Sequence, residues 1–191
     1  QTKGKHYLAS EWNIKKFSNN RFDKVKLNEN APSIIDERLY KVEKKDLSNP
    51  QIKDKKFLLI FENNLSFENS DFKNDKFKKI FLISNNNKNR KIKLSEKVIN
   101  FKDQLLIDQK LSLKKNQIDC EILNIDQITN INENLYCLYP NVGENLNFIN
   151  SNKIKNINFL YRKIDQYSWQ YCNKGFFNFR NYIPKIIKEF I

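Results

Sequence analysis

The sequence predicts an α+β protein with a central antiparallel β-sheet or small barrel, an extended N-terminal arm and C-terminal helices. Short apolar runs separated by polar turns fill the middle of the chain, while the first fifty residues lack periodicity and the last forty show helical spacing. These patterns divide the chain into an arm over residues 1–55, a β-rich core over 56–150 and a basic, aromatic-rich helical tail over 151–191. Hydrophobic residues make up 39% of the chain and aromatic residues 13%, which suffices for a packed core.

The arm contains aromatic residues at near-regular spacing within polar sequence, which favours an extended segment with aromatic anchors; they are Tyr7, Trp12, Phe17 and Phe22. One short helix is predicted over residues 33–46. Ser33 is a suitable N-cap, and acidic residues follow in the first turn. The Asn49-Pro50 pair ends this stretch.

The core contains six short apolar or alternating runs, each of strand length. They cover residues 57–62, 79–84, 91–94, 105–113, 119–125 and 135–139. Polar turn residues separate them, most clearly over 84–90. Regularly spaced short strands are typical of an antiparallel sheet or a small barrel, which is the basis of the fold prediction.

The tail changes to helical spacing. One stripe of a helix is formed by Leu160, Ile164, Tyr167 and Tyr171. Gly175 is a suitable stop because glycine adopts the left-handed conformation at a helix end. A final short helix is predicted from Pro184 to Ile191, with Ile187 and Phe190 buried.

Several classes of function are excluded by residue counts. Three glycines are too few for a phosphate-binding loop or a dinucleotide fingerprint, and the single histidine, His6, lies in the arm. The three cysteines are widely spaced, which indicates free thiols and no zinc ribbon. No apolar run approaches the length of a membrane-spanning helix. We therefore expect no cofactor, no metal site, no catalytic residue and no membrane span.

Carboxylates in the acidic middle of the chain leave one enzymatic alternative open. If the strands pair, several acidic residues could converge to bind Mg²⁺ or to act as acid and base, as in a nuclease. The candidates are Asp103, Asp108, Asp119, Glu121 and Asp126. Acidic residues spread over strands are more often the solvated face of a sheet.

The strongest functional signal is positive charge interleaved with aromatic residues. The formal net charge is +13, and lysine supplies most of it. Lysine, asparagine and isoleucine share AT-rich codons, so an AT-rich genome contributes to this charge. Cations neutralise phosphates and exposed aromatic rings stack on unpaired bases. The expected partner is RNA or another anionic surface, and the predicted RNA-contacting residues are Lys76, Lys78, Lys79, Arg90, Lys91, Lys93, Arg162, Lys163, Trp169, Lys174 and Arg180.

These observations favour a non-catalytic structural subunit of a large assembly. The first hypothesis is an RNA-contacting protein of an organellar ribosome, in a mitochondrial matrix or a plastid. The chain has no Met and begins at Gln1, so either a presequence has been removed or the chain has been trimmed. The second hypothesis is an accessory subunit of an organellar membrane complex, held by contacts with other protein subunits. A carboxylate and metal-dependent nuclease is the third.

Overall fold

The computed structural model describes residues 10–22, 26–27, 47–52, 56–90, 92–152, 154, 156–172 and 175–190. The chain forms two compact units, residues 1–45 and 46–191. The helix predicted over 33–46 lies outside the described residues, as do His6, Lys91 and Lys174. Each unit is considered by itself.

The described part of the first unit contains one helix, α1 (Glu11–Phe17), where the sequence analysis expected an extended arm. The Ser10 side chain caps it by accepting a hydrogen bond from the backbone N–H of Asn13 at 3.2 Å. Glu11 in the first turn and two lysines in the last turn complement the helix dipole. These local signals are enough to form two turns of helix.

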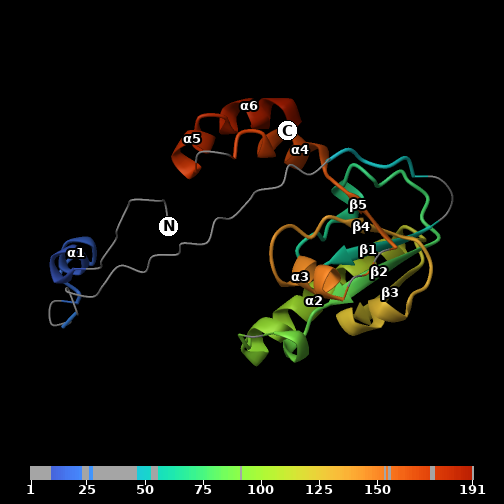
Figure 1. The fold of residues 1–191 in the computed structure, drawn as a ribbon, viewed down its shortest axis with the longest axis horizontal. Coiled ribbons are helices and arrows are strands. Elements are labelled where there is room, and N and C mark those ends of the chain that lie inside the picture. The colour runs from blue at the N-terminus through green and yellow to red at the C-terminus, as the bar shows by residue number, and fades with distance from the viewer. Residues whose placement is uncertain are drawn as a thin grey trace. The chain divides into compact units, whose positions relative to one another are not determined.

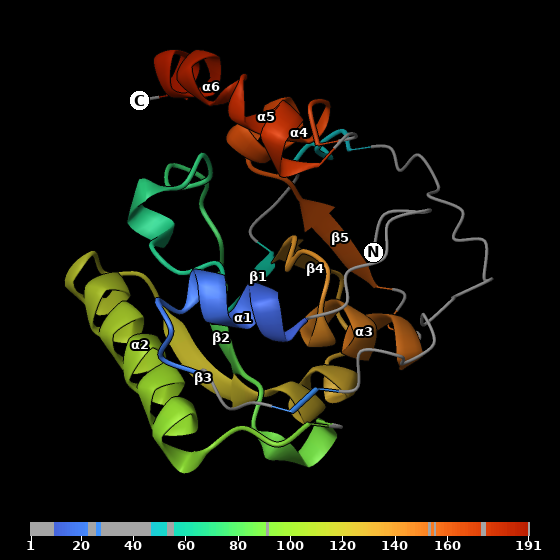
Figure 2. The same cartoon turned by 90° about the vertical axis from the view of Figure 1, so that its left-hand side faces the viewer.

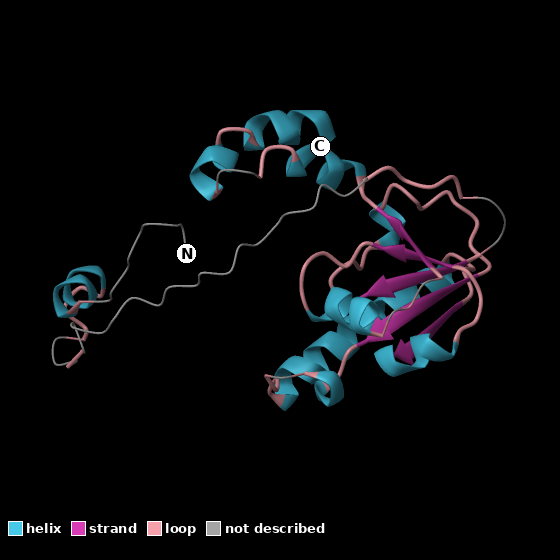
Figure 3. Cartoon of the chain, viewed as in Figure 1, coloured by secondary structure: helices cyan, strands magenta, loops and turns pink. Residues whose placement is uncertain are grey.

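The second unit is built on a five-stranded parallel sheet, so the predicted antiparallel sheet or small barrel is wrong. Its strand order is β3-β2-β1-β4-β5, and every neighbouring pair is parallel. The strands are β1 (Phe57–Phe61), β2 (Lys79–Ser84), β3 (Cys120–Asn124), β4 (Leu135–Leu138) and β5 (Ile157–Leu160). They run in one direction in Figure 3. This order is that of the first five strands of a doubly wound α/β fold.

Helices and helical turns in the connections make the parallel arrangement possible, because parallel neighbours need a crossover. The longest helix, α2 (Glu96–Lys115), joins β2 to β3. It replaces the strand predicted over 105–113. The turn η3 (Ile125–Asn130) and the helix α3 (Glu144–Ser151) precede β4 and β5 respectively (Figure 1). A short turn, η1 (Phe67–Asn69), lies in the first connection.

The two faces of the sheet form two hydrophobic cores. Alternate residues of β1 point to opposite faces of the sheet, and the last four residues of the strand are all buried. Leu58 and Ile60 pack in a core that includes Leu106 of α2. Leu59 packs in the other core, together with Ile149 of α3. The strands therefore lie between α2 and α3, as Figure 2 shows.

Four of the six predicted strands correspond to observed ones, and two do not. The prediction over 79–84 coincides with β2, and those over 57–62, 119–125 and 135–139 match within one or two residues. Residues 92–94 form no strand, and 105–113 are helical. The strand β5 was missed because Leu160 was assigned to a helical stripe. Leu160 is fully buried and ends β5.

Three short helices follow β5: α4 (Lys163–Trp169), α5 (Phe176–Arg180) and α6 (Ile183–Phe190). The predicted final helix is present, but it begins one residue earlier and buries Ile186, whereas Ile187 is 49% exposed. The segment before the sheet is tied to the end of β5. The Asn49 side chain accepts from the backbone N–H of Tyr161 at 2.7 Å and donates to its carbonyl at 2.9 Å.

Candidate nucleic-acid interface

A parallel sheet has two chemically different edges, because all strand amino ends meet at one edge and all carboxyl ends at the other. The amino edge carries the turns that lead into β1, β2 and β3. The backbone N–H of Lys78 donates to the carbonyl of Lys56 at 2.9 Å, which holds the two lead-in segments together. The last turn of α2 ends beside this edge, because the backbone of Ile118, just before β3, donates to Leu113.

The amino edge is rich in lysine. We define the amino-edge lysines as Lys56, Lys73, Lys76, Lys78, Lys79, Lys114 and Lys115. Several of them surround a surface cavity of about 870 Å³, whose wall also includes Phe77, Asn116 and Gln117. Three carboxylates line the same cavity: Glu68, Asp75 and Asp119. The cavity lining is therefore close to neutral, and excess positive charge lies on the surrounding surface.

Two of these lysines differ sharply in their surroundings. Lys79 forms an ion pair with Glu121 at 2.8 Å. The hydrogen bond with Glu121 raises the pKa of Lys79, and the same bond lowers the pKa of Glu121. Lys78 is exposed and lies over the ring of Phe57, 5.0 Å from its centroid. Lys78 therefore remains available to an anion, whereas Lys79 is neutralised.

Lys73 and Lys76 are also exposed. Among the described residues, no acidic side chain forms an ion pair with either of them or with Lys78. Glu68, on the neighbouring turn η1, is already engaged by α2. It accepts from Gln109 at 2.9 Å and from Ser112 at 2.8 Å, and the bond from Gln109 is the main cause of its lowered pKa.

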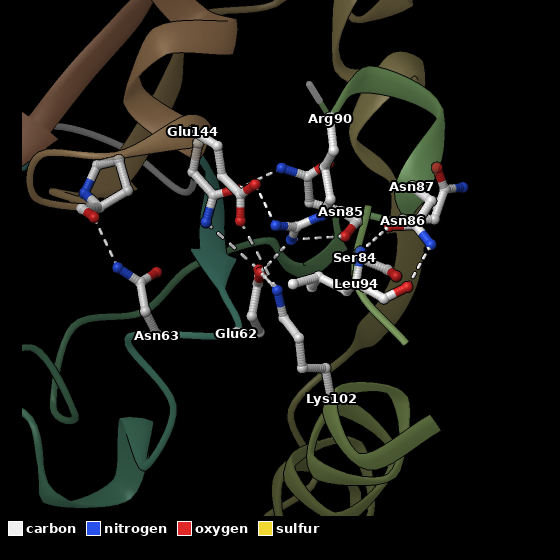
Figure 4. A network of polar contacts seen from close by, with 12 residues as sticks. Glu62, Asn63, Ser84, Asn85, Asn86, Asn87, Arg90, Leu94, Lys102 and Glu144 are labelled. Carbon is white, nitrogen blue, oxygen red and sulfur yellow. Dashed lines mark hydrogen bonds and ion pairs between the residues drawn. The ribbon is translucent and has the colours of Figure 1, made fainter. Parts of the chain in front are cut away.

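The carboxyl edge contains a compact network of opposite charges (Figure 4). Glu62 follows β1 directly, and its carboxylate forms ion pairs with Lys102 of α2 and with Arg90, the latter at 3.8 Å. Arg90 also pairs with Glu144 at the start of α3. The side chains of Glu62 and Arg90 are only 7% and 5% exposed. Two cations and two carboxylates thus neutralise each other, with Glu62 and Arg90 buried, Lys102 19% exposed and Glu144 40% exposed.

Two buried asparagines extend this network across the sheet edge. Asn85 donates to Asn145 at 2.8 Å, and Asn145 donates to Glu62 at 3.4 Å. Arg90 donates to the backbone carbonyl of Asn85 at 3.0 Å. Among the residues that the structure describes, two buried atoms, Asn85 Oδ1 and Arg90 Nε, have no hydrogen-bond partner. Three residues of the network, Asn85, Arg90 and Glu144, line a surface cavity of about 690 Å³ between the loop after β2 and α3.

This network occupies the place where α/β sheets commonly bind ligands. The strand order reverses between β1 and β4, and ligands bind outside the carboxyl ends of the strands at such a point. Here Glu62 follows β1, and Glu144 follows β4 by a short loop. The sequence analysis selected Arg90 as an RNA contact but missed its partners. A charged residue directly after a fully apolar strand, as Glu62 is, was the available signal.

The remaining predicted contacts lie in the loop after β2 and in the C-terminal helices. Lys93 is exposed and donates to the carbonyl of Asn87. Lys163 and Arg180 are exposed, but the guanidinium of Arg162 donates two hydrogen bonds to Asp165, at 2.7 and 3.0 Å. The structure therefore places the predicted contacts at several separate sites and uses three of them, Lys79, Arg90 and Arg162, in ion pairs.

Trp169 packs against other aromatic residues of the protein. Its ring packs edge-on against Tyr139, at 5.8 Å between centroids, and against Tyr161, at 6.0 Å. Tyr139 follows β4 and Tyr161 follows β5, so this cluster attaches α4 to the carboxyl edge of the sheet. Such packing explains the aromatic residue without an RNA base.

The carboxylates considered for metal binding do not converge. Asp103 accepts from Ser84 at the carboxyl edge, at 3.0 Å, whereas Glu121 pairs with Lys79. Asp126 pairs with Lys88 at 2.9 Å. Across the described ranges, no group of three His, Cys, Asp or Glu side chains is placed to hold a metal ion. In the same ranges, no helix has the length and hydropathy required to cross a bilayer.

Comparisons with known proteins give no similarity from which to argue. No family model matches the chain. Neither a curated protein nor a solved structure matches it significantly.

Proposed function

We propose that this protein is a non-catalytic, RNA-contacting structural subunit of a large assembly, and that the assembly is an organellar ribosome. The observation that carries the proposal is the difference between the two edges of the sheet. At the carboxyl edge, Arg90 and Lys102 are neutralised by the buried Glu62 and the partly exposed Glu144. At the amino edge, Lys73, Lys76 and Lys78 are exposed and available to phosphates.

The chemistry of these lysines suits RNA backbone contact. An ammonium group is a point charge that pairs with phosphate without reading the base. The turn over residues 70–78 is held in place by backbone hydrogen bonds and by the burial of Phe72, so its lysines project from a defined loop. Lys114 and Lys115 add positive charge at the end of α2. Contacts of this kind position a structural protein on folded RNA.

The network at the carboxyl edge supports a non-catalytic role. Ligand sites at a reversal of strand order are usually open crevices with a few free polar groups. Here side chains from β1, α2, α3 and the loop after β2 neutralise one another at that place. The organellar location rests on composition: Lys, Asn and Ile dominate and Ala is scarce, as in AT-rich genomes.

The first experiment is sedimentation of the native protein from an extract, with and without ribonuclease. The proposal expects the protein to migrate with a large particle that ribonuclease disperses. Migration as a single species of about 23 kDa in both conditions would refute the assembly itself.

The second experiment locates the contact. We expect Lys73→Glu with Lys76→Glu to weaken RNA binding and to reduce the slope of log K against log salt by about 1.4, two single-strand phosphate contacts at about 0.7 each. The control is Lys26→Glu with Lys97→Glu, which has the same net charge but alters exposed lysines outside the amino edge and outside the predicted contacts. Equal losses in the two double variants would show that net charge, and not the amino edge, determines binding.

One observation favours the second candidate, an accessory subunit held by protein contacts. Three apolar side chains form an exposed stripe along α2: Val98, Phe101 and Leu105 are 42%, 63% and 36% exposed. Their spacing of three and four residues places them on one side of the helix. A partner helix would cover such a stripe. A large particle that survives ribonuclease would favour this candidate over the ribosomal one.

A further inference from the structure

The C-terminal helices contain aromatic residues of two kinds. Those of the first kind pack against each other. Tyr167 packs on Tyr171 and on Phe190, with centroids 5.6 and 5.4 Å apart. Tyr171 stacks on Tyr182 at 4.2 Å, with the rings nearly parallel at 15°. Lys185 lies over the rings of Tyr167 and Tyr171, 5.8 Å from each centroid. These rings hold α4 and α6 together.

Phe176 and Phe177 are of the second kind. They open α5 and are 65% and 82% exposed. Their rings contact each other edge-on, with centroids 5.8 Å apart and planes at 67°. Gly175, with a φ of 82°, precedes them in a conformation that disfavours other residues. Two adjacent exposed phenylalanines are unfavourable in water, so a partner surface is expected over them.

The charges of the C-terminal helices that contain these rings indicate the kind of partner. Arg180 lies four residues after Phe176 and three after Phe177, so it is on the same side of α5, and it is exposed. Lys185 and Lys188 of α6 are also exposed. Residues 175–190 contain these three cations and a single acidic residue, Glu189. A polyanion with flat apolar groups matches this combination better than an uncharged apolar surface does.

We propose that α5 is a stacking platform for single-stranded RNA, in which unpaired bases stack on Phe176 and Phe177 while Arg180 contacts a neighbouring phosphate. This inference rests on the proposed RNA-contacting function. It assigns the contact with RNA bases to Phe176 and Phe177, which are not among the RNA-contacting residues predicted from the sequence. Every base has a flat face, so such a platform is tolerant of sequence. A base pair buries that face in a helix, so the platform discriminates against duplex RNA.

The test uses the full chain and a labelled oligouridylate of about 12 nucleotides, long enough to span a typical single-strand site. The double variant Phe176→Leu with Phe177→Leu keeps apolar side chains but removes the rings. We expect its affinity to fall about 100-fold, about 10-fold for each stacked base. The matched control is Phe101→Leu, the same change at a phenylalanine that is 63% exposed on α2. Its affinity should equal that of the parent chain.

The possible outcomes separate this inference from the function beneath it. If the parent chain binds neither oligouridylate nor duplex RNA, the proposed function fails and the platform fails with it. If the parent binds oligouridylate and the double variant binds as tightly as the Phe101→Leu control, the platform alone is refuted. A double variant that binds oligouridylate normally but leaves the large particle would assign the two rings to a protein partner, which also overturns the platform.

Discussion

Replacing Glu62 with Gln tests whether the ion pairs at the carboxyl edge of the sheet stabilise the fold. The substitution preserves the shape of the side chain, removes the negative charge and replaces one acceptor oxygen with an amide donor. Glu62 is 7% exposed and faces two cations, Arg90 at 3.8 Å and Lys102 in direct contact. In the variant, only Glu144, which is 40% exposed, remains to balance both cations.

The size of the effect follows from burial. At an effective dielectric constant of about 20, two unit charges about 4 Å apart interact by about 4 kcal/mol. Part of that energy offsets the desolvation of the ions. Removing one partner of a buried pair costs about 3–5 kcal/mol, because the remaining charge stays buried without compensation. We expect a loss of about 3–4 kcal/mol, since Glu144 retains one cation.

Urea unfolding followed by circular dichroism measures this loss. With a slope of about 2 kcal/mol/M, the unfolding midpoint should fall by about 1.5–2 M. The matched control is Glu121→Gln, which makes the same chemical change in the Lys79–Glu121 pair, where the side chains are 28% and 48% exposed. An exposed pair contributes about 0–1 kcal/mol, so this midpoint should fall by less than about 0.5 M. If Glu62→Gln shifts the midpoint no more than Glu121→Gln does, the network is solvated and its ion pairs do not stabilise the fold.

Three further predictions concern thiols, acid stability and the core. Cys172 is exposed, whereas Cys137 is fully buried and desolvation raises the pKa of its thiol. A thiol reagent should therefore label Cys172 first and Cys137 only on unfolding. Early labelling of Cys137 would contradict its burial. The pKa of Glu68 is lowered chiefly by the hydrogen bond from Gln109. The ionised Glu68 therefore stabilises the folded state above about pH 4.5, and this contribution is lost as the pH falls through the folded-state pKa. The Glu68→Gln variant should therefore lose less stability between pH 6 and pH 3 than the parent chain, in urea titrations at each pH; parallel curves would contradict this. Leu59→Ala should cost about 2–5 kcal/mol in the same assay, because Leu59 is fully buried in β1, and a cost below about 1 kcal/mol would contradict its central place.

The positions of four strands were predictable from the sequence, but their direction was not. In β1 and β4 all or nearly all residues are apolar, which is typical of strands buried on both faces of a parallel sheet. The sequence analysis read such runs as antiparallel strands because it did not find the crossover helix α2. The buried side of α2 includes Lys102 and Gln109 among its leucines, which interrupts the apolar period. Val98 and Phe101, in contrast, are exposed.

The same limit applies to the candidate site. Composition predicts a role for the basic residues, but whether each cation is available depends on partners far away in the chain. Arg90 is neutralised by Glu144, 54 residues later. Trp169 packs on Tyr139 and Tyr161, whereas Phe177 remains exposed. Aromatic residues occur throughout residues 159–190, and their sequence positions alone do not indicate which of them the fold buries.

The sequence by itself determined the local features of this protein: where β1 to β4 lie, the final helix, the free thiols and the excess of lysine. Each depends on neighbours within a few residues, which propensity and spacing report directly. Tertiary structure alone decided the parallel order of the strands, the pairing of charges at the carboxyl edge and the choice of cations that remain exposed. These features depend on contacts between residues tens of positions apart, whose energies depend on burial, and burial is defined only once the chain has folded.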